Sequence, residues 1–306
     1  SFCRMSHEYS TGSAYLKIHV AVLLFGFTAI LGGLIDLPAL SIVWWRVLFT
    51  SFSLIFLTRF LKTLKGVPNG LKMRYSLIGM LIGLHWICFY GSVKLSNASI
   101  CLVCMSTTSL FTSLLEPLMV RTRFSTIDLG FGVIIVPAFF LIVQSLDTSM
   151  TLGIIVGLLS ALLAALFSIL NKKYIKGADP FTITFLELSS AWVMISVLLV
   201  VFSVTGLYNA VILPPGWDDW FYLVVLALLC TTLAHVLSLQ ALKTLSVFNA
   251  NLIINLEPVY GILLAGLILN EHKELDAMFY TGTAIILGAV IVYPFVKNIL
   301  TKPKLN

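Results

Sequence analysis

The sequence predicts an all-α integral membrane protein, with ten transmembrane helices arranged as two inverted repeats of five helices. Three observations lead to this prediction. Of the 306 residues, 59% are hydrophobic and only 10% are charged, whereas soluble domains carry about 25% charged residues. Ten apolar stretches each have close to the ~20 residues that cross a bilayer. The basic residues collect in every second connecting loop, which is the pattern that orients membrane proteins.

The ten predicted spans follow one another with short connections, so neighbours in sequence are expected to be neighbours in space. We expect no cleavable signal peptide, because the first ten residues are polar and no short apolar core with a small-residue cleavage site follows. The predicted spans cover residues 15–34, 38–60, 74–93, 97–118, 126–145, 151–171, 180–204, 220–240, 246–269 and 277–296.

Lysine and arginine residues orient these spans. If the N-terminus is cytoplasmic, 16 of the 19 basic residues lie on the cytoplasmic side. The outer loops then hold only Lys94 and Lys273, and Arg46 lies within a span. This bias predicts a multi-pass protein of the cell (inner) membrane with both termini in the cytoplasm. The net charge of +6 comes from these short loops, so it indicates a lipid bilayer and no nucleic-acid partner.

The ten spans divide into two sets of five, and the second set starts on the opposite side of the membrane. A repeat between them must therefore be inverted, which is typical of secondary transporters. We predict a first repeat over residues 1–147 and a second, inverted repeat over residues 148–306. The alternative is a chance likeness between apolar helices.

A shift of 149 residues aligns parts of the two repeats. It places Thr108 on Glu257 and Ser109 on Pro258. The pair Glu116-Pro117 resembles Glu257-Pro258, but it falls out of this register. The two Glu-Pro pairs are therefore not equivalent positions of the repeat.

The ninth span is the most polar of the ten, since Asn251, Asn255, Glu257 and Pro258 lie in its middle. A charged side chain at the bilayer centre costs roughly 3 kcal/mol or more, and Pro258 removes a hydrogen bond of the helix. At ~100° per residue, the polar residues including Tyr260 cover most of the circumference, so we expect protein on all sides. Glu257 is either a cavity group that binds a proton or a substrate ammonium, or a hydrogen-bonding strut between helices.

Further polar and aromatic residues inside the spans are candidates for a solute cavity. Arg46 is either a cation for a substrate carboxylate or a structural charge that forms an ion pair or reaches the outer interface. His85 offers a group that titrates near neutral pH, and Trp86 offers an aromatic wall. For His85 and His235, the alternative is a hydrogen bond to a neighbouring helix. We expect Glu187 to be solvated near the cytoplasmic surface, with a pair to Arg46 as the alternative.

The run Leu256-Glu257-Pro258-Val259-Tyr260, together with Arg46 and the segment Gly153 to Lys172, resembles a known family. Over nearly its whole length the chain looks like an EamA-type protein of the drug/metabolite transporter superfamily. The segment Arg121-Thr122-Arg123 departs from that family, in which a Gly-Glu pair is usual after span four. The resemblance implies a ten-helix inverted repeat around a central cavity that moves small organic solutes, often outward.

These features predict a secondary transporter or facilitator for a small organic metabolite that is either amino-acid-like or amphipathic. We expect it to work by alternating access around a midplane cavity, with efflux as the direction. Protons are a candidate coupling ion, through Glu257 or a histidine. We predict no cofactor, metal site or catalytic group. A membrane-embedded enzyme and a membrane receptor or assembly protein remain alternatives. The predicted substrate-binding residues are Glu257, His85, Trp86, Asn255, Asn251, Tyr260, His235 and Arg46.

Overall fold

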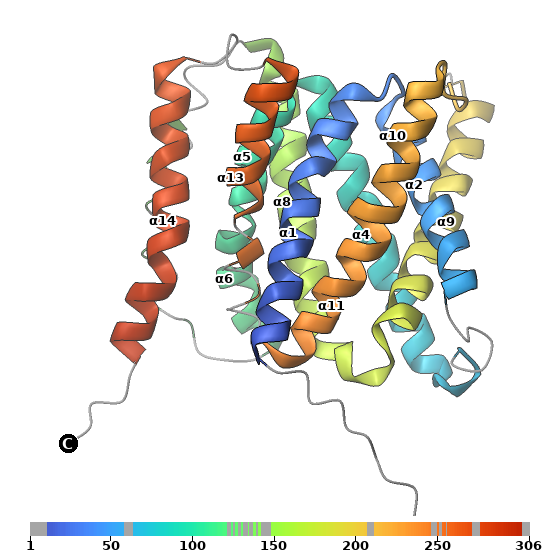
Figure 1. Ribbon diagram of the computed structural model, residues 1–306, viewed down its shortest axis with the longest axis horizontal. Coiled ribbons are helices and arrows are strands. Elements are labelled where there is room, and N and C mark those ends of the chain that lie inside the picture. Colours follow the sequence, from blue (N-terminus) through green and yellow to red (C-terminus); the bar gives the residue numbers. More distant parts are fainter. Residues whose placement is uncertain are drawn as a thin grey trace, which may run out of the picture.

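The fold consists of α-helices that run roughly parallel and antiparallel to one another (Figure 1). Among the residues that the structure describes there is no strand. Seven of the described helices are long and apolar enough to cross a membrane, and shorter apolar helices cover Glu257–Leu269 and Ala277–Ala289. The computed structural model describes residues 11–57, 64–120, 124, 126–127, 130, 134, 137–138, 140–141, 148–206, 211–245, 250, 253–254, 256–270 and 276–301.

The helices of the first half agree with the predicted spans, with one difference. The predicted span 97–118 is two helices, because the helix is interrupted at Thr107. The predicted span 126–145 falls mostly outside the described residues. The helices are α1 (Thr11–Leu34), α2 (Ala39–Leu57), α4 (Asn69–Leu95), α5 (Ala98–Ser106) and α6 (Thr108–Val120).

The second half contains both continuous and interrupted helices. Asp179 caps the start of α9 by accepting from the backbone of Thr182 at 3.1 Å, and Pro180 takes the first position of the helix, where proline is favoured. The helices are α8 (Thr151–Tyr174), α9 (Pro180–Val204), α10 (Trp217–Ala227), α11 (Ala234–Thr244), α13 (Glu257–Leu264) and α14 (Ala277–Thr301), with π-helical turns η3 (Leu228–Leu233) and η4 (Ala265–Leu269) and 3₁₀ turns η1 (Thr148–Met150) and η2 (Ile175–Gly177).

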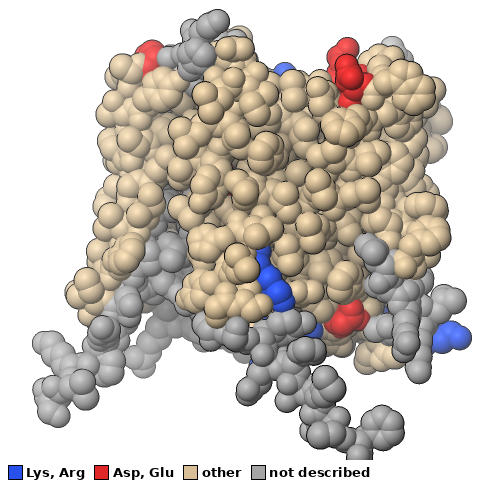
Figure 2. All heavy atoms as spheres, viewed as in Figure 1, with Lys and Arg blue, Asp and Glu red and all other residues tan. Residues whose placement is uncertain are grey.

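The two ends of the bundle differ in charge. We call the end at which α1 begins and α14 ends the lower end, and the opposite end the upper end, as in Figure 1. The surface in view is uncharged across its middle, and charged side chains gather towards the two ends (Figure 2). Helix termini at the lower end carry the basic residues Lys17, Lys72, Arg74, Lys172, Lys173 and Lys243, whereas the upper end carries Asp36, Lys94, Asp218, Asp219 and Asp276.

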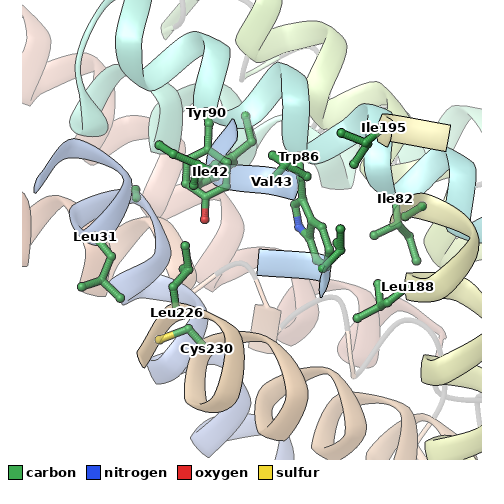
Figure 3. Packing of buried hydrophobic residues seen from close by; sticks show 14 of the residues in the cluster. Leu31, Ile42, Val43, Ile82, Trp86, Tyr90, Leu188, Ile195, Leu226 and Cys230 are labelled. Carbon is green, nitrogen blue, oxygen red and sulfur yellow. The ribbon is translucent and has the colours of Figure 1, made fainter. Parts of the chain in front are cut away.

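Aliphatic and aromatic side chains from several helices fill the interior. Leu31, Ile42, Tyr90 and Leu226 belong to one buried cluster, which joins α1, α2, α4 and α10 (Figure 3). Small residues bring helix backbones together in two places. At Gly79 of α4, an added Cβ atom would overlap the carbonyl group of Glu187 in α9. Helices α1 and α13 approach at Gly26 and Gly261, as is common where membrane helices pack closely.

Candidate functional site

A cavity of about 120 Å³ lies inside the bundle, and its volume is roughly ten times the space that one water molecule needs. It begins at the middle of α1, α2 and α4. It continues along the C-terminal half of α8 and along α11, and both helices end at the lower end. The lining residues are Phe25, Thr28, Arg46, Ile82, His85, Trp86, Phe89, Met105, Thr108, Ser109, Thr112, Ala164, Phe167, Ser168, Asn171, His235, Ser238, Leu239, Leu242, Ile254, Glu257 and Pro258.

Arg46 of α2 is the cationic group of this cavity wall. Its side chain is only 1% exposed, and it neither reaches the interface nor forms an ion pair with a described acid. Its Nε donates to Thr231 Oγ1 (2.5 Å), and one terminal nitrogen donates to Tyr90 Oη (2.7 Å). The guanidinium carbon lies 4.0 Å from the centroid of the Trp86 ring. Neutral groups therefore hold the guanidinium in place without cancelling its charge.

The π-helical turn η3 supplies part of this support. In a π-helix the hydrogen bonds join residues five apart, and the hydroxyl of Thr231 donates to the carbonyl of Leu226 at 2.7 Å. The carbonyl of Cys230, inside the same turn, lies 3.5 Å from Arg46 Nη2. The π-helical turn thus directs the hydroxyl of Thr231 and the backbone carbonyl of Cys230 towards the guanidinium. Single π-helical turns occur often at functional sites.

His85 and Trp86 of α4 form the aromatic side of the cavity. His85 Nδ1 lies 2.9 Å from both the carbonyl oxygen and the hydroxyl of Ser160 in α8. The hydrogen bond to a neighbouring helix that the sequence left as an alternative is therefore present, and His85 still lines the cavity. Phe167 of α8 lies next to the imidazole, with 5.3 Å between the ring centroids. This side offers flat, apolar rings.

Glu257 lies on the cavity wall at the first residue of α13. The predicted interruption is present, since Leu256 forms a turn and Pro258 occupies the first turn of the new helix. No hydrogen bond or ion pair joins the Glu257 carboxylate to another described residue. The charge of Arg46 acts on it across the cavity. The described contacts thus show no strut between helices at Glu257.

Glu187 corrects one expectation from the sequence. It is completely buried and not solvated, and its partner is His235 and not Arg46. Glu187 Oε2 lies 3.1 Å from His235 Nε2. The physical reason is helix packing: α9 is covered by α4 and α11, so the side chain cannot reach the cytoplasmic surface. His235 thus both holds Glu187 and lines the cavity.

Of the remaining predicted site residues the structure describes only Tyr260, which does not line this cavity. Tyr260 packs in the cluster formed by Ile18, Val22 and Leu242 with their neighbours, and its Cβ faces Gly26. Asn251 and Asn255 lie outside the described residues. Five of the eight predicted residues therefore share one cavity, namely Glu257, His85, Trp86, His235 and Arg46.

Sequence reasoning missed several lining residues. Thr108 and Ser109 begin α6 on the cavity wall, and the 149-residue shift that pairs them with Glu257 and Pro258 was a signal for both. Asn171 of α8 also lines the cavity. Asn171 precedes two lysines near the end of a span. This pattern predicts a solvated helix end, so there was no reason in the sequence to expect Asn171 in the cavity.

Comparisons with known proteins bear on the fold and on the family of the second half. The model of the EamA-like transporter family matches residues 151–293. Residues 151–293 are an EamA-like transporter domain. One solved structure, described only as "Crystal structure of protein", is similar over 95% of this chain and 99% of its own, with a TM-score of 0.67 and 14% sequence identity. At that identity the likeness shows the fold alone. No curated protein matches the chain.

The EamA-like domain supplies one side of the cavity. Asn171, His235 and Glu257 come from the domain, whereas Arg46 and His85 come from the half of the chain that precedes it. The cavity therefore lies between the two halves. The apolar helices are those of a multi-pass membrane protein, and the family that matches the second half of the chain is one of transporters.

Proposed function

We propose that this protein is a secondary transporter of a zwitterionic, amino-acid-like or amphipathic solute, and that it works by alternating access around the cavity between its halves. The observation that carries the proposal is the composition of that cavity. Arg46 provides a cation that forms no ion pair with a described acid, Glu257 provides a carboxylate without a described hydrogen bond, and Trp86 and Phe167 provide apolar rings. Such a site complements a small molecule that carries a carboxylate, an ammonium group and an apolar side chain.

Residues 1–147 and 148–306 form the two inverted repeats of this proposal, each with five spans. The helix interruptions support it, because α6 begins at Thr108 and α13 begins at Glu257, which are the positions that the 149-residue shift pairs. Both positions line the cavity. Transporters with inverted repeats commonly place interrupted helices at their binding sites.

Helix neighbours support the same repeat. Helix α1 packs against α11 and α13. If the halves are exchanged, α1 corresponds to α8, α11 corresponds to the end of α4, and α13 corresponds to α6. Helix α8 does pack against α4, α5 and α6. The two halves thus meet through equivalent pairs of helices.

The conformation proposed for this structure is closed at the upper end. There the backbone N–H of Asp36 donates to Asp219 Oδ1 at 2.8 Å, and Lys94 Nζ donates to the carbonyl of Ile35 at 2.5 Å. Trp45 Nε1 donates to the carbonyl of Ile212 at 2.7 Å. The cavity instead extends towards the basic lower end, which in this proposal is the cytoplasmic end because basic residues favour the cytoplasmic side. Solute would enter from the cytoplasm, which suits export across the cell (inner) membrane.

A binding screen followed by a transport assay tests this function. A panel of amino acids and related amphipathic metabolites is added to the purified protein, because a ligand of the folded state raises its apparent stability. Liposomes with the protein are then loaded with the stabilising solutes, and exchange with labelled solute is followed. We expect at least one zwitterionic solute to stabilise the protein and to exchange. Stabilisation without any exchange would favour a receptor and contradict transport.

A further inference from the structure

A second buried acid lies behind the cavity wall and takes no part in the proposed solute contacts. Glu187 of α9 is 0% exposed. It is hydrogen-bonded to His235 of α11, whose Nε2 lies 3.1 Å from Glu187 Oε2. Asn171 of α8 faces the same carboxyl group. His235 and Asn171 line the cavity, so the acid is one side chain away from the solute path.

Two oxygen atoms in this cluster have no donor. Glu187 Oε1 and Asn171 Oδ1 are both buried, and neither has a hydrogen-bond partner in the part of the chain that the structure describes. A buried acceptor without a donor is destabilising, and a charged acceptor is more so. One proton on Glu187 Oε1 would turn that oxygen into a donor, and the Asn171 amide, which interacts with the same carboxyl group, would accept from it once the amide oxygen faces the carboxyl group. A single bound proton therefore relieves both unpaired acceptors.

Among the described residues, no lysine or arginine compensates the charge of Glu187. Helix α9 packs against α2, α4 and α11. On α2, Arg46 is bound to Tyr90 and Thr231, and on α8, Lys172 donates to the carbonyls of Leu242 and Leu245.

The remaining titratable groups that face Glu187 carry no fixed positive charge. On α4, Tyr75 interacts with Glu187, and its hydroxyl donates to the carbonyl of Tyr174. His235 of α11 is charged only when it is protonated. A buried carboxylate without a permanent cation is costly. Burial therefore favours the protonated form of this carboxyl group.

We propose that Glu187, His235 and Asn171 form a proton-binding site that couples solute movement to proton movement; this inference rests on the transport function proposed above. A proton from a hydronium ion in the cavity binds Glu187 Oε1 and leaves a water molecule behind. In the loaded state the carboxylic acid donates to Asn171 Oδ1, and neutral His235 donates from Nε2 to Glu187 Oε2. Unloading returns the proton to cavity water and restores the carboxylate.

We propose that the conformational change between the two access states occurs when the cluster is protonated and neutral. In that form every oxygen of the carboxyl group and of the Asn171 amide has a partner, and no buried charge has to move with the helices. The unloaded form carries a buried negative charge beside the cavity, which favours the conformation in which water reaches it. Because both His235 and Asn171 line the cavity, protons reach the site from the side on which the cavity is open.

Infrared difference spectroscopy of the full-length protein in liposomes tests the site without a solute. The C=O stretching band of protonated carboxyl groups is followed during a pH titration. We expect one component of this band to disappear with rising pH in the wild type and to be missing in Glu187→Gln, whereas the components of other carboxyl groups, such as Glu257, remain. The control Asp218→Asn, which removes an exposed carboxylate at the upper end, keeps the band. A titrating band that is identical in Glu187→Gln and wild type would overturn the proposal.

A second variant covers the case in which Glu187→Gln does not fold. Asn171→Leu keeps the acid and removes its proposed acceptor. The C=O band of Glu187 then moves to higher frequency, because it loses a hydrogen bond. An unshifted band contradicts the proposed loaded state.

Transport of labelled phenylalanine separates failure of the coupling from failure of the transport function. We expect an imposed pH gradient to drive its accumulation by the wild type, whereas Glu187→Gln moves it equally with and without the gradient. Exchange by the wild type that is indifferent to the gradient would overturn the coupling and leave the transport function intact. If no solute of the panel is exchanged, the transport function fails and the coupling fails with it, while the infrared band still decides whether protons bind at Glu187.

Discussion

Arg46 stacks on Trp86 in the wall of the cavity, with 4.0 Å between the guanidinium carbon and the ring centroid. The ring and the hydroxyl groups of Tyr90 and Thr231 fix the direction of the guanidinium. No carboxylate among the described residues forms an ion pair with it. An arginine held by neutral partners keeps its charge for a ligand, and its planar fork suits a carboxylate.

Arg46→Lys should weaken solute binding although the charge is kept. Lysine lacks the planar fork and does not stack as guanidinium does. We expect about a tenfold higher concentration of phenylalanine for half-maximal thermal stabilisation, which corresponds to about 1.4 kcal/mol. Arg74→Lys is the matched control, since Arg74 also stacks on an aromatic ring, that of Tyr174, but at the lower end. Equal half-maximal concentrations for Arg46→Lys and wild type would contradict the binding role.

Gly79→Ala should destabilise the fold. The added Cβ would overlap the backbone carbonyl of Glu187 and the hydroxyl of Ser190, so α4 and α9 must separate. Overpacking of this kind costs about 1–3 kcal/mol. At Gly70 of the same helix an added Cβ meets nothing within 4 Å, and we expect Gly70→Ala to be neutral or stabilising. Thermal unfolding in detergent measures both, and a Gly79→Ala protein as stable as Gly70→Ala would show that the helices are not in this close contact.

Lys94→Met should loosen the upper end. It removes the donor to the carbonyl of Ile35 that ties α4 to the end of α1. A reporter cysteine in the cavity, Ser168→Cys, should then react faster with a membrane-impermeant maleimide that is added from the upper side. Lys172→Met is the control, because it removes contacts at the lower end and should not raise labelling from the upper side. The same labelling rate with and without Lys94→Met would argue against a closure at this end.

Helix positions could be predicted from the sequence because they depend on local properties. The predicted span 180–204 is the helix Pro180–Val204, since an Asp-Pro start and a long apolar run define it without reference to the rest of the chain. The interruption at Pro258 was predictable for the same reason, because a missing N–H is a property of the residue itself.

Side-chain partners could not be predicted in the same way, because they depend on how helices rotate against one another. Glu187 was expected in water, yet the packing of α9 against α4 and α11 turns it inwards to His235. Tyr260 was expected at the site and packs against α1 instead. The π-helical turn that carries Thr231 left no signal in the apolar run Leu228–Leu233. The sequence thus predicted which residues in the middle of the spans line the cavity better than it predicted which partners they contact.

Exchange of labelled phenylalanine in liposomes, compared between wild type and Glu257→Gln, tests most directly whether the cavity is the solute path. Glutamine preserves the shape of the side chain at the start of α13 and removes the negative charge that faces the cavity. We predict that the wild type exchanges phenylalanine faster than protein-free liposomes do, and that Glu257→Gln lowers this rate about tenfold, or about 1.4 kcal/mol, with little change in thermal stability. Equal exchange rates for Glu257→Gln and wild type would contradict a cavity in which Glu257 binds the solute.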